Sequence, residues 1–305
     1  MSTDLPRSSA GFPPLPAGFP PLPAGFVWVT RGADAFAAAD GPLAAALRER
    51  GLLEPSGVRR ALAGGEGSRG RAPTAAVALG EPGTSLVLRG LRRGGLFGPL
   101  LGAALLGPAR PFRELAATAA LHAAGAPVPR PAAAVAWRHG PVWNAAVATR
   151  LEDGALDAGA FLRSDPAPAR LRAALAAAGR AVRRFHDAGG SHRDLHIGNL
   201  LVRADPCEAL VIDLDGARVG PSLEPAARMA ELMRLYRSLR KRDLLGRVGE
   251  RGCVAFLRAY VAGDRALRRA LLARLRLERR RVAIHALHYR RKTVPSPPGQ
   301  LDRLE

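Results

Sequence analysis

The sequence predicts an α+β protein with two lobes, a small mixed sheet followed by a mostly helical region. Between residues 58 and 148, short apolar runs alternate with glycine- and proline-rich turns, a pattern typical of strands. Beyond residue 149, apolar residues recur at helical spacing instead. The chain has 305 residues, 48% of them apolar, so it can bury a sizeable core.

The first lobe is predicted over residues 25–148. Its helix is expected to begin at Pro111, which suits a first helical turn, and to run to Ala124, where Gly125 can stop it. The expected strands are 58–62, 75–79, 85–89, 132–137 and 142–148. Five strands and one helix make a small mixed-sheet domain.

The second lobe is predicted over residues 149–292. Leu171, Leu175 and Ala178 begin an apolar stripe at helical spacing, and the helix is expected to end at Gly189. Two short strands are expected at 200–202 and 209–214, followed by arginine-rich helical patterns. The last residues, 293–305, are predicted to be a tail.

The N-terminus contains a short repeat. The sequence AGFPPLP occupies residues 10–16, recurs at 17–23 and begins again at 24–26. A period of seven that is so rich in proline is too short for a repeat architecture, so residues 1–24 are predicted to be a disordered leader. A peptide-binding role stays open, because proline-rich segments are common ligands of aromatic grooves.

The charge is strongly basic, with a formal net charge of +20. Nearly all of it is arginine, since Lys241 and Lys292 are the only lysines. Residues 226–295 hold 20 basic and 5 acidic side chains. This balance favours anionic partners such as phosphates, lipid head groups or nucleic acid, although a solvated helical face is an equal alternative. No recognition motif supports nucleic acid, which we therefore exclude.

Cysteine content and hydropathy predict a cytoplasmic protein. Cys207 and Cys253 cannot form a disulfide framework, which suits a reducing compartment. No signal peptide is recognisable at the N-terminus. The uncharged run at residues 94–109 is too short and too rich in glycine and proline to span a bilayer.

The most informative stretch is residues 191–202, SHRDLHIGNLLV, followed by VIDLD at 211–215. In phosphoryl transfer, one carboxylate receives the proton of the acceptor hydroxyl while other oxygens hold Mg²⁺ against the triphosphate. Asp194 fits the first task, and Asn199 and Asp213 fit the second, because the hairpin between the two strands returns Asp213 beside Asn199. The alternative is a polar loop with capping residues, but the complete H-R-D-x-x-x-x-N pattern favours a kinase.

A glycine-rich motif lies upstream. Gly65, Gly67 and Gly70 match G-x-G-x-x-G between two predicted strands, where backbone N–H groups can approach the phosphates of ATP. A plain hairpin loop is the alternative. A dinucleotide-binding fold is excluded, because the segment that follows, 75–79, is predicted to be a strand and not a helix.

Kinase chemistry also requires a cation on the third strand, paired with a carboxylate on the next helix. Arg89 and Glu114 occupy these positions. The first lysine of the chain is Lys241, so the usual lysine is missing from the strand, and arginine can clamp phosphate through two hydrogen bonds. The alternative is that Arg89 is an exposed strand residue and that Glu114 belongs to a side-chain pair on the surface of the helix.

These motifs resemble the protein-kinase-like superfamily. More narrowly, the chain is similar to the bacterial lipopolysaccharide-core sugar kinases, among them the kinases of 3-deoxy-D-manno-octulosonic acid (Kdo). Residues 88–96, LRGLRRGGL, resemble the family's LRHYRRGGL, and RPFRE at 110–114 and RLYRSLRK at 234–241 also match. The likeness covers roughly residues 25–290. The chain departs from it where Gly-Leu replaces His-Tyr within 88–96, and within the loop at 196–198.

The resemblance implies ATP-dependent phosphorylation of a Kdo hydroxyl on a lipid A precursor, at the cytoplasmic face of the inner membrane. It implies that Asp194 is the catalytic base, that Asn199 and Asp213 bind Mg²⁺, and that Arg89 with Glu114 clamps the nucleotide.

The neighbouring arginines Arg92 and Arg93 are candidates for substrate binding, and the apolar residues after them for contact with the membrane. A glycine-rich surface loop is the alternative there. Few residues separate Asp213 from the next helical pattern, so a protein substrate is not expected. Two other functions stay open, a core heptose kinase and a catalytically silent, membrane-associated scaffold of kinase fold.

Overall fold

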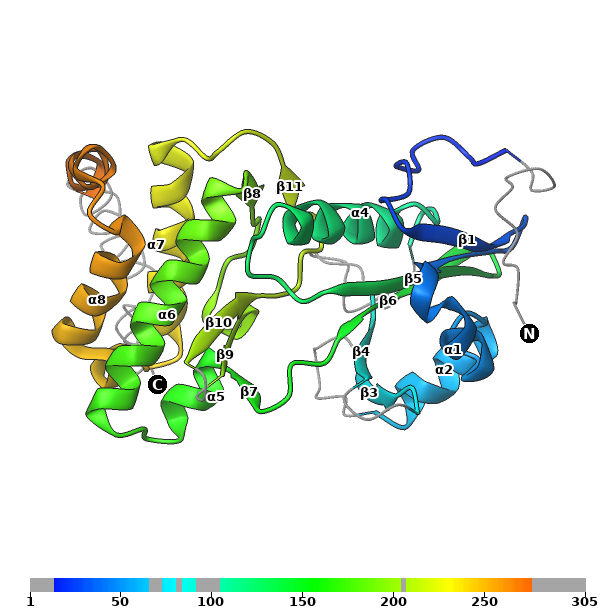
Figure 1. Cartoon of the computed structure of the whole chain (residues 1–305), viewed down its shortest axis with the longest axis horizontal. Coiled ribbons are helices and arrows are strands. Elements are labelled where there is room, and N and C mark those ends of the chain that lie inside the picture. The colour runs from blue at the N-terminus through cyan, green and yellow to red at the C-terminus, as the bar shows by residue number, and fades with distance from the viewer. Residues whose placement is uncertain (1–13, 66–72, 81–83, 92–104, 204–206, 276–305) are drawn as a thin grey trace, which may run out of the picture.

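The computed structural model describes residues 14–65, 73–80, 84–91, 105–203 and 207–275. They form a sheet-rich N-lobe and a mostly helical C-lobe (Figure 1). The predicted α+β fold with two lobes is therefore confirmed.

The N-lobe is built on an antiparallel six-stranded sheet in the order β1-β2-β5-β6-β4-β3. The strands are β1 Phe26–Arg31, β2 Ala35–Asp40, β3 Thr74–Ala78, β4 Ser85–Gly90, β5 Pro131–His139 and β6 Val142–Arg150. β5 is alanine-rich and buried from Pro131 to Trp137, which indicates that both faces of the sheet are covered here.

Helices cover the two faces of this sheet (Figure 1). Phe36 of β2 packs with Phe112 of α4 on one face, whereas the next residue, Ala37, packs with Leu47 of α1 on the other. This alternation follows the two-residue period of a strand. The elements concerned are η1 Gly41–Leu43, α1 Ala44–Glu49, α2 Pro55–Ala63 and α4 Arg110–Ala123.

The structure corrects one predicted element of this lobe. Residues 58–62, predicted as a strand, lie in helix α2, which begins at Pro55. Val58, Ala61 and Leu62 all pack into the same core cluster, and their spacing of three and four residues is helical. The glycine-rich motif therefore follows a helix, and not a strand as predicted. Strands β1 and β2 and helix α1 were not predicted at all.

The structure describes residues 14–24 of the predicted leader, and they are not a disordered segment as predicted. Residues 14–24 form no helix or strand, but Leu15, Phe19 and Leu22 pack against the N-lobe core. Residues 1–13 and the tail at 293–305 lie outside the described residues.

The C-lobe combines helices with two small sheets. The helices are α5 Ala158–Arg163, α6 Pro168–Asp187, α7 Pro225–Lys241 and α8 Leu245–Val261, with a further helical segment at 265–275. The sheets contain β7 Ala155–Asp157, β9 Leu200–Arg203 and β10 Glu208–Val211, and β8 Gly190–Ser191 with β11 Arg218–Val219. Gly179 lets α6 approach α8 closely, since a Cβ there would lie 2.3 Å from the Phe256 carbonyl oxygen.

The predicted helix before Gly189 and the two predicted strands are present as α6, β9 and β10. β10 ends at Val211, so Asp213 lies in the loop that follows it. None of the helices in the described part of the chain is long and apolar enough to cross a membrane.

Candidate active site

The loop between β8 and β9 is folded around His192. The His192 side chain is buried; its Nδ1 accepts a hydrogen bond from the Asp194 backbone N–H (3.1 Å), and its Nε2 lies 3.1 Å from the Ile212 carbonyl oxygen. Since Nδ1 is an acceptor, Nε2 carries the hydrogen and donates it to Ile212. One ring thus joins the loop that carries Asp194 to the residue before Asp213.

Asn199 closes the same loop. Its Nδ2 donates to the Asp194 carbonyl oxygen over 3.0 Å, which leaves Oδ1 as the free acceptor of the amide. The backbone N–H of Ile212 donates to the Asn199 carbonyl oxygen, also over 3.0 Å. The structure therefore brings Asp194, Asn199 and Asp213 together in the way that their spacing predicts.

The two carboxylates remain accessible. The side chain of Asp194 is 79% exposed and that of Asp213 is 40% exposed. Asp213 has a φ of 59°, in the left-handed region that non-glycine residues rarely adopt. Such conformations cost about 1–3 kcal/mol and concentrate at functional sites.

Arg89 on β4 is in contact with carboxylates from both lobes. Its guanidinium hydrogen-bonds to Glu114 of α4, and its Nη2 lies 3.2 Å from Oδ1 of Asp213. Burial lowers the pKa of Arg89, but these two carboxylates outweigh it and raise the pKa above its ordinary value. The predicted pairing of Arg89 with Glu114 is present, so the reading of Arg89 as an exposed strand residue is wrong.

Glu114 is buried, and burial raises its pKa to about 6. Arg89 opposes this shift, whereas the charges of Asp215 and Asp213 add to it. Burial is the largest of these influences, so the pKa of Glu114 stays above its ordinary value.

A second arginine links the lobes, and sequence reasoning missed it. Arg110 opens α4 and forms two parallel hydrogen bonds to Asp215, one of them from Nε to Oδ1 over 2.9 Å. The hydrogen bonds with Asp215 raise the pKa of Arg110. Both residues lie within motifs that carry the family resemblance, but nothing in their spacing pairs them.

His196 lies beside Asp194, with Nε2 3.7 Å from Oδ2. Its Nδ1 accepts the Gly198 backbone N–H over 3.0 Å, so the neutral ring carries its hydrogen on Nε2, facing Asp194. Burial lowers the pKa of His196, which favours the neutral form.

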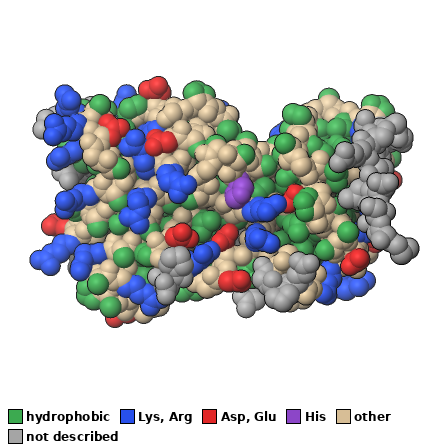
Figure 2. Space-filling view, in the orientation of Figure 1, with side chains coloured by type: hydrophobic (Ala, Val, Ile, Leu, Met, Phe, Trp, Pro, Cys, Tyr) green, Lys and Arg blue, Asp and Glu red, His purple; other side chains and the backbone are tan. Residues whose placement is uncertain are grey.

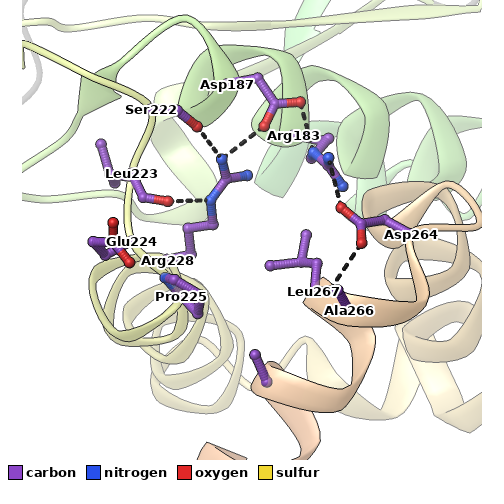
Figure 3. A pocket seen from close by; sticks show the side chains of 11 residues that line it. Arg183, Asp187, Ser222, Leu223, Glu224, Pro225, Arg228, Asp264, Ala266 and Leu267 are labelled. Carbon is purple, nitrogen blue, oxygen red and sulfur yellow. Dashed lines mark hydrogen bonds and ion pairs between the residues drawn. The ribbon is translucent and has the colours of Figure 1, made fainter.

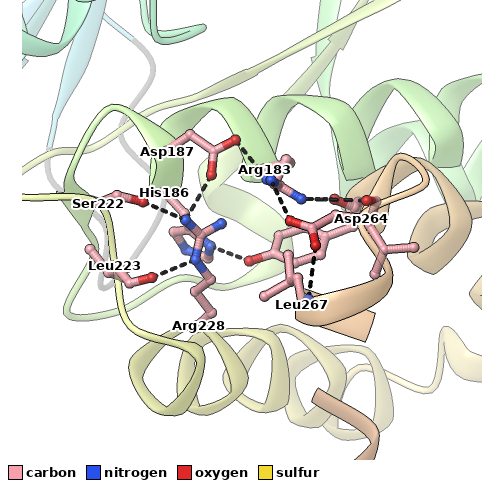
Figure 4. A network of polar contacts seen from close by, with 10 residues as sticks. Arg183, His186, Asp187, Ser222, Leu223, Arg228, Asp264 and Leu267 are labelled. Atoms are coloured by element: carbon pink, nitrogen blue, oxygen red, sulfur yellow. Dashed lines mark hydrogen bonds and ion pairs between the residues drawn. The ribbon is translucent and has the colours of Figure 1, made fainter. Parts of the chain in front are cut away.

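A buried hydrogen-bond network of the C-lobe supports the loop that carries Asp194. Glu231 of α7 accepts hydrogen bonds from Ser191 Oγ (2.9 Å), from the His192 backbone N–H (3.0 Å) and from Nε2 of His186 (3.1 Å). Burial acts to raise the pKa of Glu231, but these hydrogen bonds lower it. His186 also contacts the Tyr260 hydroxyl over 2.7 Å, and Figure 4 shows His186 behind Arg228.

A cavity of about 460 Å³ opens elsewhere, where α6 ends and α7 begins (Figure 3). It contains none of the predicted site residues. Its arginines are already paired, Arg183 with Asp187 and Asp264, and Arg228 with Asp187. Figure 2 shows the molecular surface notched between the lobes instead, with basic and acidic side chains side by side at their junction.

The structure describes only part of the predicted phosphate-binding and substrate-binding residues. Gly65 lies between α2 and β3, where a Cβ would be 2.2 Å from the Thr74 carbonyl oxygen, so close packing alone requires glycine. Gly67, Gly70, Arg92 and Arg93 lie outside the described residues.

Mg²⁺ fits this site if a nucleotide shares it. Among the described residues, no group of three or more His, Cys, Asp or Glu side chains could hold a metal alone. Mg²⁺ usually takes only one or two carboxylates and completes its shell with water and substrate phosphates. The accessible carboxylate of Asp213 and the free Oδ1 of Asn199 match that requirement.

The two lobes, the H-R-D-x-x-x-x-N loop and the Arg89–Glu114 pair define a protein of the kinase-like fold class. Residues 65–260 match the model of the lipopolysaccharide kinase (Kdo/WaaP) family, and the chain belongs to this family.

The curated relatives include the 3-deoxy-D-manno-octulosonic acid kinases of Vibrio cholerae (33% identity over 162 residues) and Photobacterium profundum (35% over 160 residues). These matches cover 52% and 51% of this chain and only 66% and 65% of the relatives. Among solved structures, "WaaP in complex with acyl carrier protein" matches with a TM-score of 0.48 and 22% identity, over 75% of this chain and 94% of that one.

Proposed function

We propose that this protein is an ATP-dependent kinase that phosphorylates a hydroxyl of Kdo in the lipopolysaccharide inner core, on a lipid A precursor. One observation carries the proposal. In a member of the Kdo/WaaP family, an accessible Asp194 lies on a loop that closes on Asn199 and Asp213, beside Arg89 and Glu114. This combines a base, oxygen ligands and a phosphate-binding cation in one place.

Each residue has a distinct role in this reaction. Asp194 accepts the proton of the sugar hydroxyl as its oxygen attacks the γ-phosphorus of ATP, and ADP leaves. His196 faces Asp194 with Nε2–H, 3.7 Å from Oδ2, which is close enough for electrostatic attraction but beyond hydrogen-bond distance. Asn199 and Asp213 would hold Mg²⁺, which neutralises charge on the triphosphate when bound.

Arg89 clamps the nucleotide in this proposal. It contacts Asp213 in the described structure, and phosphate oxygens would take the place of that carboxylate, while Glu114 holds the guanidinium in position. Gly65, Gly67 and Gly70 are proposed to line the phosphates, and Arg92 and Arg93 to contact the acceptor.

The surface near the loop of Asp194 is basic, which suits an acidic acceptor. The exposed residues Arg240, Lys241 and Arg242 lie at the end of α7, and the charge of Arg242 acts on the ring of His196. We infer that this end of the helix faces substrate phosphates and the anionic cytoplasmic surface of the inner membrane, each nearby charge contributing about 1 kcal/mol.

Phosphate transfer from ATP to a Kdo-bearing lipid A precursor, followed by mass spectrometry with Mg²⁺ present, tests the proposal. Asp194→Asn should abolish the transfer, whereas Asp34→Asn, at an exposed aspartate in the N-lobe, should leave it unchanged. Transfer to a heptose-bearing acceptor alone would favour a core heptose kinase. Binding of ATP without transfer to either acceptor would favour the silent scaffold.

A further inference from the structure

The second copy of the N-terminal repeat lies in an aromatic groove of the N-lobe. We call residues 14–24 the strap; it runs next to β1 (dark blue in Figure 1). The Phe19 ring lies 4.9 Å from that of Phe36, 5.1 Å from Phe112 and 5.8 Å from Trp28. Leu15 and Leu22 pack against the same core cluster, so Phe19 anchors a continuous contact.

In the described part of the repeat, each Ala-Gly turn is followed by a phenylalanine that packs into the N-lobe core. Gly18 and Gly25 have φ angles of 90° and 83°, and the residue after each, Phe19 or Phe26, enters the same cluster. The Gly18 carbonyl oxygen accepts a hydrogen bond from Nε of Arg113 over 3.0 Å. The positive φ favours glycine at this turn, and a Cβ on Gly18 would lie 2.9 Å from Nη2 of that arginine, so the guanidinium would have to shift.

The groove and the candidate active site share the first turn of α4. Arg110 binds Asp215 and Glu114 binds Arg89 on the side of the active site. Between them, Phe112 packs under Phe19, and Arg113 donates to the strap. Phe112 is only 1% exposed, so loss of Phe19 would uncover the residue that fixes this turn.

We propose that Trp28, Phe36, Phe112 and Arg113 form a binding groove for the Ala-Gly-Phe-Pro-Pro-Leu-Pro motif, filled by residues 17–23 of the chain itself. Its occupancy holds the first turn of α4 in the position that Arg89 and Asp215 require. The groove stands on the contacts alone, whereas its effect on catalysis rests on the proposed function.

Peptide binding to the full-length chain tests the groove without any enzymatic reaction. In Phe12→Ala/Phe19→Ala both copies lose their anchor, so a synthetic peptide of residues 17–23 should bind, as measured by calorimetry. The same peptide with alanine for phenylalanine should bind at least about tenfold more weakly. The wild-type chain should bind the peptide on the order of tenfold more weakly, because a tethered copy competes at about millimolar effective concentration.

Equal binding of the two peptides, or no binding by a double variant whose circular dichroism is native, would overturn the groove. If the double variant does not fold, Gly18→Ala replaces it, with Gly11→Ala at the same position of the other copy as its control. Gly18→Ala should then bind the peptide more tightly than Gly11→Ala does, and equal binding would again reject the groove.

Phosphate transfer tests the effect on α4. Phe12→Ala/Phe19→Ala, which leaves no copy of the motif with its phenylalanine, should lower kcat/KM about tenfold through displaced active-site groups, and added peptide should restore it, whereas Phe12→Ala should match wild type. Unchanged transfer in the double variant would refute the effect on α4 and leave the groove intact. Absence of transfer in the wild type would instead count against the proposed kinase function, and the calorimetric result would still stand.

Discussion

The loops that carry Asp194 and Asp213 are held by two regions of opposite character. From the C-lobe, Glu231 supports the Asp194 loop through a buried hydrogen-bond network. From the N-lobe, Arg89 and Arg110 reach aspartates that are partly exposed. A buried network cannot exchange partners without a large cost, whereas an exposed ion pair can. The C-lobe therefore gives the Asp194 loop fixed support, and the N-lobe gives the Asp213 loop support that can exchange partners.

Removal of the C-lobe support should have the largest effect. Glu231→Ala leaves His186, Ser191 and the His192 backbone N–H without their acceptor, so the free energy of unfolding should fall by about 3 kcal/mol or more. Urea denaturation measures this loss. Glu231→Gln, which keeps one acceptor oxygen, should lose less.

The control is Glu224→Ala, at an exposed glutamate that begins the same helix and makes no capping hydrogen bond. It should change stability by less than about 0.5 kcal/mol. If the Glu231 and Glu224 variants were equally stable, the C-lobe network would not be the firmer of the two supports.

The N-lobe support should show itself in the pH dependence of stability. The pKa of Glu114 is raised from 4.5 to about 6 in the folded protein, so the folded state binds more protons in this window. Its contribution is present below pH 4.5 and is lost as pH rises through about 6, a loss of about 2 kcal/mol at 1.36 kcal/mol per pKa unit.

The lowered pKa values of Glu231 and His186 act in the opposite direction, so the contribution of Glu114 is the difference between Glu114→Gln and the wild type, measured by chemical denaturation from pH 4 to 7. Relative to Glu114→Gln, the wild type should lose stability as pH rises, and Glu49→Gln, which alters an exposed glutamate, should follow the wild type. The same pH dependence in Glu114→Gln and in the wild type would mean that burial of Glu114 makes no such contribution.

The contacts that are predictable from the sequence are those that phosphoryl transfer requires. The spacing of Asp194, Asn199 and Asp213 encloses a loop and a hairpin, so their proximity follows from chain geometry. The Arg89–Glu114 pair is predictable because a phosphate-binding cation needs a nearby carboxylate.

Other features depend on tertiary packing and leave no pattern. The short run at 58–62 is apolar enough for a strand or a helix, and only packing against the sheet selects α2. β2 is mostly alanine, which has no strand preference, and is buried because helices cover both faces. The docking of Phe19 depends on a groove assembled from β1, β2 and α4, which the composition of the leader does not reveal.

The smallest effect should come from the second N-lobe arginine. The pair of Arg110 and Asp215 is partly exposed, so its coupling free energy should be about 1 kcal/mol despite the two parallel hydrogen bonds. A double-mutant cycle of Arg110→Ala and Asp215→Ala, read by denaturation, measures it. The exposed pair of Arg138 and Asp34, 3.8 Å apart, serves as a control cycle and should give a value near zero. Because the Arg110 pair joins α4 to the loop of Asp213, its loss should also lower kcat a few-fold. Coupling as weak as in the control pair would leave Arg89 as the contact that holds this loop to the N-lobe.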